Sequence, residues 1–326
     1  MIIYQSKSHN PYFNIAAEEY FLKNFTDDVF YLYVNEPSII VGKHQNTIAE
    51  INVPYVIQNE LKVVRRLSGG GTVFHDLGNL NYCFIQNGTE GHLVDFKKYS
   101  QPVLDTLNDL NVNAYLRGKS DLVIDDLKFS GNAEHVFKNR ILHHGTLLFS
   151  SELNSLNKAI QADWTKFNDK AVRSNRSKVT NIIDHLEKPL TIYEFEQKVI
   201  ETVILQNKQV ESYALTKSDE EAINTLVDEK YSTWKWNFAY SPKYEFKKEI
   251  PISHGVLSSK ISVNKGFIES LSVLINSNSF DFSGELEKRV LNKPHDFYVL
   301  KNEISGFFDE NHAIPFTFDE FLKTMF

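Results

Sequence analysis

Several residue types and patterns are scarce in this sequence, and each scarcity excludes a class of protein. A single cysteine, Cys83, stands among 326 residues, so no intramolecular disulfide can form. The amino terminus lacks the basic stretch and apolar run of a secretory signal, and no run approaches the ~20 apolar residues of a membrane-spanning helix. Lys and Arg total 35 against 42 Asp and Glu, a formal net charge of -7. We therefore expect a soluble cytoplasmic protein that binds neither nucleic acid nor a membrane.

The residues that are present are typical of a globular protein of about two domains. Hydrophobic residues make up 42% of the chain, aromatic residues 13% and charged residues 24%, which is enough apolar material for a sizeable core. A chain of 326 residues exceeds what one core usually organises. The aromatic stretch at 234–246 indicates a junction. We expect a catalytic domain over 1–246 and a small α/β domain over 247–326.

Short runs of β-branched and aromatic residues predict strands, and they do not alternate strictly with helices. We therefore expect an α+β (mixed α/β) fold, a mixed sheet packed by helices, and not a doubly wound parallel sheet. The predicted strands lie at 29–34, 38–42, 62–66, 80–85, 111–116, 121–124, 127–131 and 141–149, with a hairpin turn at 264–266. The predicted helices lie at 14–25, capped by Asn14, at 103–110, at 153–160, and at 191–205 and 218–231 behind the capping boxes Thr191-Glu194 and Ser218-Glu221. Two last helices, at 284–291 and after the box Thr317-Glu320, should close the small domain, the second burying Phe318, Phe321, Leu322 and Met325.

The densest chemical signal is KVVRRLSGGGTVFHDLGNLNYCF, residues 62–84, in which three consecutive glycines follow two arginines. Glycine loses more conformational entropy on folding than other residues, so three in a row indicate positive φ angles or close approach to a ligand. Backbone N–H groups in such a loop can converge on an anion, and Arg65 or Arg66 adds a planar fork for carboxylate or phosphate. A wide glycine hairpin is the alternative. The sequence matches neither a P-loop nor a dinucleotide fingerprint.

A second cluster, residues 118–149, contains a lysine beside a turn. The run LKFSG predicts a strand in which Lys128 and Ser130 share one face and Leu127 and Phe129 share the other. Such a lysine is ordinarily a solvated residue at a sheet edge. The Ser-Gly-Asn-Ala turn that follows it favours a functional role.

Three further features are ambiguous. His143 and His144 are adjacent, so in a strand they face opposite sides and cannot share one metal; one of them should be a hydrogen-bonded core or site residue. The basic segment 170–182 is either a solvated loop or a flap that folds over a phosphate. Cys83 lies in a run typical of a buried strand, where a free thiol is usually inert.

Six motifs resemble those of the lipoate-protein ligases. They are NPYFNIAAEEY (10–20), GKHQNTIAEIN (42–52), RRLSGGGTVFHDLGN (65–79), LKFSGNA (127–133), HHGTLL (143–148) and VRSNRSKVTN (172–181). The resemblance implies a catalytic domain with the class II aminoacyl-tRNA synthetase/biotin ligase-like fold. It extends more weakly to the small C-terminal domain, which is an accessory domain in the ATP-using ligases. GKHQN, where the family often reads GRxQN, is a mild departure at Lys43.

The resemblance implies a two-step reaction. The carboxylate of lipoate attacks the α-phosphorus of ATP to give lipoyl-AMP and pyrophosphate, and a lysine of a lipoyl carrier domain then attacks the mixed anhydride and releases AMP. ATP and lipoate are the implied substrates, and Mg²⁺ is the implied cofactor. The implied partners are the lipoyl carrier domains of 2-oxoacid dehydrogenases and the glycine-cleavage H protein.

The resemblance also assigns roles by motif position. Lys128 is the implied catalytic residue, which contacts both the lipoate carboxylate and the adenylate phosphate. The implied ATP- and lipoate-binding residues are Arg66, Ser68, Gly71, Thr72, Val73, Phe74, His75, Lys128, Gly131, Arg173 and Lys178. Asp121 is the implied magnesium-linked acid. This assignment agrees with the residues themselves, because cationic donors are needed to bring two anions together and to stabilise the charge of the transition state.

Three alternatives compete with the ligase. An octanoyl or lipoyl transferase of the same fold uses no ATP and needs a cysteine nucleophile, but Cys83 lies outside the region after HHGT where that nucleophile is expected. A biotin ligase is disfavoured because the glycine motif and HHGT follow the lipoate pattern. A non-catalytic lipoate-binding protein is a third reading, which lipoate-dependent exchange of pyrophosphate into ATP would exclude.

Overall fold

The computed structural model describes residues 1–88, 94–160, 163–311 and 313–326. The chain divides into two compact units. The first unit comprises Met1–Lys43, Leu61–Ile160 and Ser174–Thr233, and the second comprises His44–Glu60, Gln161–Arg173 and Trp234–Phe326. The second unit therefore holds the whole region 247–326 together with segments that precede residue 247 in the sequence.

The first unit is built on an eight-stranded mixed sheet with the order β12-β1-β2-β6-β10-β9-β8-β7. β1 pairs in parallel with β2 and β12, and the pairs from β2 to β7 are antiparallel. The predicted mixed sheet is confirmed. Its strands are β1 (Ile2–Gln5), β2 (Val29–Val34), β6 (Asn79–Asn87), β7 (Ala114–Arg117), β8 (Asp121–Ile124), β9 (Leu127–Phe137), β10 (Arg140–Leu148) and β12 (Glu211–Ser212).

A three-stranded sheet in the same unit carries the glycine loop. β3 (Ser38–Val41) lies between β4 (Lys62–Arg65), which is parallel to it, and β5 (Val73–His75), which is antiparallel. Residues 66–72 connect β4 to β5. The loop therefore leaves the carboxyl end of β4 and enters β5, and both strands pair with β3. The sheet packs into the core through four buried side chains, those of Ile39, Ile40, Val63 and Val64. This packing fixes both ends of the loop.

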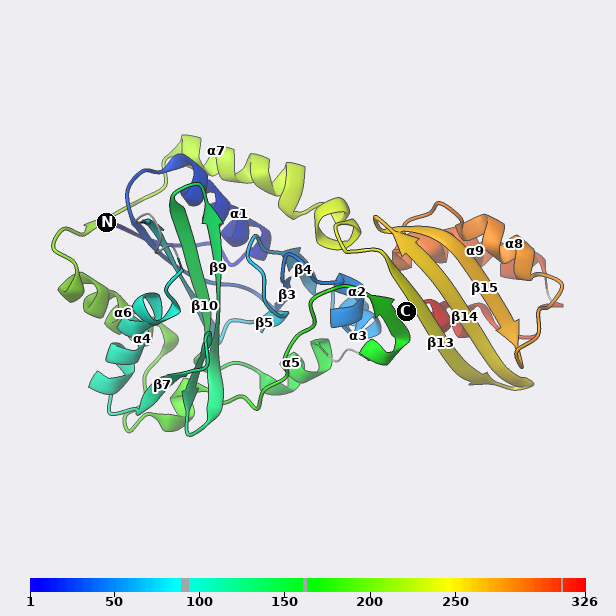
Figure 1. Ribbon diagram of the computed structural model, residues 1–326, viewed down its shortest axis with the longest axis horizontal. Coiled ribbons are helices and arrows are strands. Elements are labelled where there is room, and N and C mark those ends of the chain that lie inside the picture. The colour runs from blue at the N-terminus through cyan, green and yellow to red at the C-terminus, as the bar shows by residue number, and fades with distance from the viewer. Residues whose placement is uncertain (89–93, 161–162, 312) are drawn as a thin grey trace. The chain divides into compact units, whose positions relative to one another are not determined.

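Helices cover both faces of the large sheet. α4 and α6 pack against alternate residues such as Phe30 and Leu32 of β2, while α1 meets Tyr31 and Tyr33 on the opposite face (Figure 1). The helices of this unit are α1 (Pro11–Asn24), α4 (Phe96–Asp109), α5 (Leu153–Ala159), α6 (Ile192–Gln206) and α7 (Lys217–Leu226), with short turns at Ile182–His185 and Val227–Tyr231. The capping box Thr191-Glu194 is confirmed.

Two predicted N-caps are wrong. α1 begins at Pro11 with Asn10 as its N-cap, whereas Asn14 is buried inside the helix and donates to the side chain of Asn35 at 2.8 Å. α7 is opened by Thr216 and Asp219 and not by the box at residue 218. The Asp219 carboxylate also accepts hydrogen bonds from the hydroxyls of Tyr20 and Tyr213. These bonds hold the carboxylate where it caps the helix at Thr216.

The second unit has a four-stranded antiparallel sheet in the order β11-β13-β14-β15, and three helices pack on it (Figure 1). Its strands are β11 (Phe167–Asp169), β13 (Tyr244–Ile252), β14 (Gly255–Asn264) and β15 (Phe267–Ile275), and its helices are α2 (Thr47–Glu50), α3 (Val53–Gln58), α8 (Ser283–Val290), α9 (Phe297–Glu310) and α10 (Phe318–Met325), with short turns at Trp164–Lys166 and Lys235–Ala239. The predicted hairpin and the capping box Thr317-Glu320 are confirmed.

The sequence prediction missed α9, so three helices and not two follow the hairpin in the described part of the chain. Its sequence is rich in Phe and contains Gly306, which hides the helical period, but Asp296 caps the first turn by accepting from two backbone N–H groups. Leu300, Ile304 and Phe307 then recur on one face and are buried. Phe318 is only partly buried, because its ring packs at the edge of the core.

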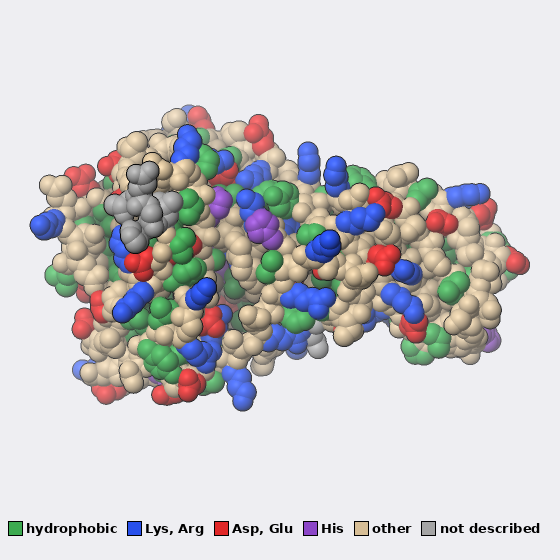
Figure 2. Space-filling model, in the orientation of Figure 1, with side chains coloured by type: hydrophobic (Ala, Val, Ile, Leu, Met, Phe, Trp, Pro, Cys, Tyr) green, Lys and Arg blue, Asp and Glu red, His purple; other side chains and the backbone are tan. Residues whose placement is uncertain are grey.

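The surface carries both signs of charge. Lys and Arg side chains are interspersed with Asp and Glu over the face seen in Figure 2, in agreement with the modest net charge of -7. Among residues 1–88, 94–160, 163–311 and 313–326, no helix is long and apolar enough to cross a membrane.

Acidification should destabilise the second unit through His295. The ring is buried; Nδ1 accepts from the Tyr244 hydroxyl at 2.6 Å and Nε2 donates to the Met325 carbonyl at 2.7 Å. Burial lowers the pKa of His295 to about 4, so the unfolded chain, with a histidine pKa of about 6.5, binds the proton first. Between pH 7.5 and 5 this group should remove about 2 kcal/mol of stability.

Hydrogen exchange of the β13 and β14 amides at the two pH values measures this loss. His295→Gln should show a flatter pH dependence than the wild type. An equally steep dependence in that variant would assign the acid sensitivity to another group.

Candidate active site

A β-bulge determines where Lys128 points. β9 pairs with β8 so that Val123 lies opposite Lys128 but Leu122 lies opposite Ser130, a register shift that inserts one extra residue into β9. Phe129 and Ser130 are consequently both buried. The predicted alternation, with Lys128 and Ser130 on one face, is therefore wrong, because the extra residue leaves Lys128 on the face of Asp121 and Gly131, opposite Ser130.

The bulge brings Lys128 over the directly paired residues Asp121 and Gly131. Its Nζ forms an ion pair with Asp121 Oδ1 at 2.7 Å, and a Cβ atom built on Gly131 would lie 3.1 Å from the same nitrogen. The side chain of Lys128 is 23% exposed and that of Asp121 is 25% exposed. The absence of a side chain at Gly131 thus gives the ammonium group a place to lie, within reach of solvent and a ligand.

Arg66 lies behind the glycine loop and holds its shape. The guanidinium is buried and donates from Nη2 to the carbonyl oxygens of Gly69 at 2.6 Å and Gly71 at 2.7 Å, and from Nη1 to Ile40 at 3.0 Å. Its Nε donates to Ser68 Oγ at 3.0 Å. Burial lowers the pKa of Arg66 to about 10, which leaves it cationic at neutral pH.

Substituting the first and second glycines of the loop should have different effects. Gly70 has a φ of +86°, and a Cβ atom there would lie 3.1 Å from Arg66 Nη2. Gly69 has no atom within 4 Å of a built Cβ. We expect Gly70→Ala to lower the unfolding free energy by about 1–2 kcal/mol and Gly69→Ala to change it by less than about 0.5 kcal/mol. Denaturant titration of both variants measures the difference, and equal losses would contradict this loop conformation.

The glycine loop and Lys128 meet through β9. A Cβ atom on Gly70 would lie 3.9 Å from the side chain of Ala133. Ala133 and Gly131 share one face of the strand and lie about 7 Å apart, and Gly131 contacts the Lys128 ammonium group. The loop and the lysine are therefore neighbours along one short stretch of the sheet.

The segment 174–180 spans the same stretch from the other side. Ser174 Oγ accepts a hydrogen bond from the backbone N–H of Thr72 at 2.8 Å. Further along, Lys128 N–H donates to the Lys178 carbonyl at 2.9 Å and Thr180 N–H donates to the Lys128 carbonyl at 3.0 Å. One end of the segment therefore touches the glycine loop and the other pairs with the lysine backbone.

The remaining residues singled out from the sequence are distributed as follows. Val73, Phe74 and His75 form β5, with Phe74 and His75 buried. His75 Nδ1 accepts from Asn35 at 3.0 Å, and burial lowers the pKa of His75 to about 3. Arg173 lies in the second unit, and its neighbour Ser174 lies in the first.

Both histidines of HHGT are hydrogen-bonded and on opposite faces, as predicted for adjacent residues of a strand. His143 pairs with Glu134 at 2.8 Å, and His144 approaches Ser68 at 2.6 Å and Glu18 at 2.9 Å. Sequence reasoning missed Glu18, which is 2% exposed. The available signal was an acidic pair inside the otherwise apolar run NIAAEEYFL.

The oxygen donors near Lys128 suit a magnesium ion whose other ligands would come mainly from the phosphates of a bound substrate. In the part of the chain that the structure describes, no cluster of three or more His, Cys, Asp or Glu side chains could hold a metal ion. Mg²⁺ usually keeps several waters and binds through one or two carboxylates together with substrate phosphates. Asp121, which is partly exposed beside Lys128, can supply one such carboxylate.

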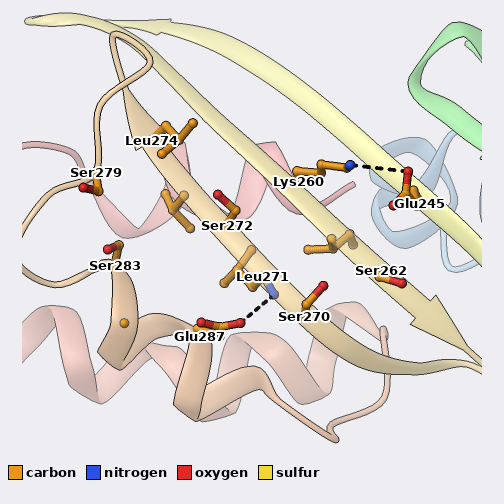
Figure 3. A pocket seen from close by; sticks show the side chains of 13 residues that line it. Glu245, Lys260, Ser262, Ser270, Leu271, Ser272, Leu274, Ser279, Ser283 and Glu287 are labelled. Carbon is orange, nitrogen blue, oxygen red and sulfur yellow. Dashed lines mark hydrogen bonds and ion pairs between the residues drawn. The ribbon is translucent and has the colours of Figure 1, made fainter.

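A groove of about 390 Å³ lies in the second unit, between the edge strand β15 and the start of α8 (Figure 3). Its polar lining consists mainly of serine hydroxyls. Of its charged residues, Lys260 and Glu245 pair with each other at 3.4 Å, and Glu287 accepts from the Leu271 N–H at 3.4 Å. None of the residues singled out from the sequence is among the described residues that line it. The groove therefore shares no residue with the site around Lys128.

Comparison with known proteins identifies the family. A family model described as the lipoyl protein ligase A/B catalytic domain matches residues 10–204. Lipoate–protein ligase 1 of Staphylococcus aureus is 38% identical over 300 residues, which covers 91% of this chain and 91% of that protein. This chain belongs to the lipoate-protein ligase family. The region matched by the family model contains every residue from Arg66 to Lys178 that the sequence singled out.

Solved structures of other proteins share the fold. The P. falciparum protein LipL1, solved in complex with lipoate, has a TM-score of 0.64 and 22% identity, with coverage of 96% of this chain and 98% of that one. A lipoate-protein ligase A bound with ATP has a TM-score of 0.60 and 23% identity, covering 73% of this chain and 97% of that one. The expected fold of the family is confirmed.

Proposed function

We propose that this chain activates lipoate with ATP and transfers the lipoyl group to a lysine of a carrier domain. In the first step a lipoate carboxylate oxygen bonds to the α-phosphorus of ATP and the bond to pyrophosphate breaks. In the second step the carrier lysine nitrogen bonds to the acyl carbon, AMP leaves, and the nitrogen loses its proton. The observation that carries this proposal is the approach of Lys128 and the glycine loop on one face of β9 in a chain of this family.

The two reactants of the first step are anions that repel each other. A fixed ammonium group between the carboxylate and the α-phosphate reduces this repulsion and stabilises the charge that builds up in the transition state. Lys128 supports this role because it is partly exposed and has Gly131 beside it. We assign Lys128 as the catalytic residue, and Thr72, Gly71 and their neighbours as the binding loop.

Asp121 is the residue that would hold Mg²⁺. The ion, when bound, neutralises phosphate charge and orients the triphosphate. Asp121 has a second role in the proposal, because its ion pair at 2.7 Å keeps the Lys128 ammonium group over Gly131.

The carrier is proposed to be a lipoyl domain of the 2-oxoacid dehydrogenases or the glycine-cleavage H protein, in the cytoplasm. The basic segment that includes Arg173 and Lys178 is suited to guide an acidic partner. We propose residues 1–246 as the catalytic domain and 247–326 as an accessory domain of the same enzyme.

Lipoylation of a purified apo carrier domain tests the overall reaction. Mass spectrometry should detect addition of one lipoyl group only when the full-length protein, lipoate, ATP and Mg²⁺ are all present. A carrier domain whose acceptor lysine is replaced by arginine is the matched control. Lipoylation that proceeds without ATP would contradict the ligase assignment and support a transferase.

Cys83 is an unsuitable nucleophile for the transferase alternative. Its thiol is fully buried, and burial together with the Glu18 carboxylate raises its pKa well above the ordinary value, which disfavours the reactive thiolate. Cys83→Ser should therefore retain carrier lipoylation within about threefold of the wild type, since no step needs the sulfur. Loss of activity at unchanged thermal stability would contradict this and revive the transferase reading.

A further inference from the structure

The glycine loop is oriented from behind by the Arg66 guanidinium. In a trans peptide the carbonyl oxygen and the following N–H point in opposite directions. Because Arg66 Nη2 binds the carbonyl oxygens of Gly69 and Gly71, the N–H groups of Gly70 and Thr72 must point away from the guanidinium. The Thr72 N–H accordingly donates to Ser174 on the opposite side of the loop. Arg66 thus controls the direction of the amide donors from the carbonyl side of the loop.

A continuous series of hydrogen bonds holds this guanidinium in place. Ser68 Oγ accepts from Arg66 Nε at 3.0 Å, so its own proton is directed to His144 Nε2 at 2.6 Å. His144 Nδ1 therefore carries the other proton and donates it to the Glu18 carboxylate, at 2.9 Å from Oε2 and 3.0 Å from Oε1. The Tyr33 hydroxyl donates to the same carboxylate at 2.9 Å. Hydrogen bonds thus connect the guanidinium to the carboxylate without a break.

The series is buried from end to end. The exposed fractions are 0% for Ser68, 2% for Glu18, 5% for Arg66 and 8% for His144. A buried guanidinium and a buried carboxylate each need a counter-charge, and here the Ser68 hydroxyl and the His144 imidazole connect them. The geometry resembles a Ser-His-acid triad, but the Ser68 hydroxyl is inaccessible and accepts a bond from a cation, so it is not a nucleophile.

We propose that Glu18 and His144 are positioning residues, which act through Ser68 to lock Arg66 behind the glycine loop and so keep the loop in the conformation that binds the anionic substrate. This inference rests on the proposed function, since the anion is the lipoyl-adenylate. Glu18 comes from α1 and His144 comes from β10. Both elements thereby set the conformation of a loop that neither of them adjoins in the sequence.

Two substitutions of His144 test the proposal. Glutamine can accept from Ser68 through its amide oxygen and donate to Glu18 through its amide nitrogen, whereas leucine can do neither. With full-length protein and the non-hydrolysable probe lipoyl-sulfamoyl-adenosine, His144→Leu should bind at least about tenfold more weakly than the wild type, and His144→Gln within about threefold. Calorimetry measures both dissociation constants. Equal affinity of His144→Leu and the wild type would overturn the proposal.

His143 provides the matched control on the same strand. It forms a comparable buried pair with Glu134 at 2.8 Å, but on the face opposite the glycine loop. His143→Leu should keep probe affinity within about threefold even where it lowers thermal stability. Equal weakening by the two leucine variants would show a general structural effect and refute the positioning role.

Two outcomes separate this inference from the proposed function. If the wild type does not bind the probe, the ligase assignment itself fails. If the wild type binds the probe and the variants His144→Leu and Ser68→Ala bind it equally well, only the positioning role fails. Should His144→Leu not fold, Ser68→Ala removes the bridging hydroxyl with a smaller change and should weaken probe binding by at least about tenfold.

Discussion

Replacing Lys128 by alanine should lower the rate of lipoyl-AMP formation by about 10²–10³-fold while the fold stays intact. The rate falls because the variant has no ammonium group to bring the carboxylate and α-phosphate together. The fold survives because the ion pair with Asp121 is about one quarter exposed and contributes only ~1 kcal/mol at most. Lipoate-dependent release of pyrophosphate by purified protein measures the rate, and far-UV circular dichroism verifies the fold.

The control for this result is a lysine at the other end of the same hairpin. Lys138 is exposed in the turn after β9, where it lies 5.4 Å from the ring of Phe137. Lys138→Ala should release pyrophosphate at a rate within about twofold of the wild type. Wild-type activity in Lys128→Ala would remove the catalytic assignment of Lys128.

Gly145→Ala should destabilise the first unit by about 3 kcal/mol. Gly145 is paired with both Tyr82 and Asn132 in the centre of the sheet. A Cβ atom there would overlap the Asn132 amide oxygen and would lie 2.6 Å from a ring carbon of Tyr82. It would also break the hydrogen bond of 2.5 Å from the hydroxyl of the buried Tyr82 to the partly buried Asn132. The glycine of HHGT is therefore required by packing across three strands.

Thermal unfolding measures this effect, with Gly306→Ala as the control. A loss of this size should lower the first unfolding midpoint by roughly 6–12 °C. Gly306 lies inside α9, and no atom lies within 4 Å of a Cβ built on it. Gly306→Ala should stabilise its helix by about 0.5–1 kcal/mol. An unchanged midpoint for Gly145→Ala would contradict the close packing of β6, β10 and β9.

Local signals explain which parts of the fold could be predicted. The strands at 29–34 and 121–124 and the boxes at Thr191 and Thr317 depend on residues within one element, so the sequence contains the whole signal. The start of α7 depends on more, because Tyr20, which is distant in sequence, helps Tyr213 to fix the Asp219 carboxylate. A pattern read along the chain does not contain those partners.

In the candidate site, too, some features could be predicted from the sequence and others depend on the fold. The glycine loop is recognisable from composition alone, yet the role of Arg66 in holding its carbonyl oxygens depends on the fold of the loop around it. The face of Lys128 was mispredicted because strand alternation assumes regular pairing, and the register shift beside Phe129 arises from pairing with β8. The burial of Glu18 depends on strands that lie 15 or more residues away along the chain. The roles of the individual site residues stay predictions.

The most direct test of the account is lipoate-dependent exchange of labelled pyrophosphate into ATP by the full-length protein. Exchange requires reversible formation of lipoyl-AMP, so it isolates the first step from the choice of carrier. The account predicts rapid exchange that needs both lipoate and Mg²⁺, and that Lys128→Ala reduces by about 10²–10³-fold. Absence of exchange in the wild type, under conditions where lipoate binds, would contradict the claim that this chain joins lipoate to AMP.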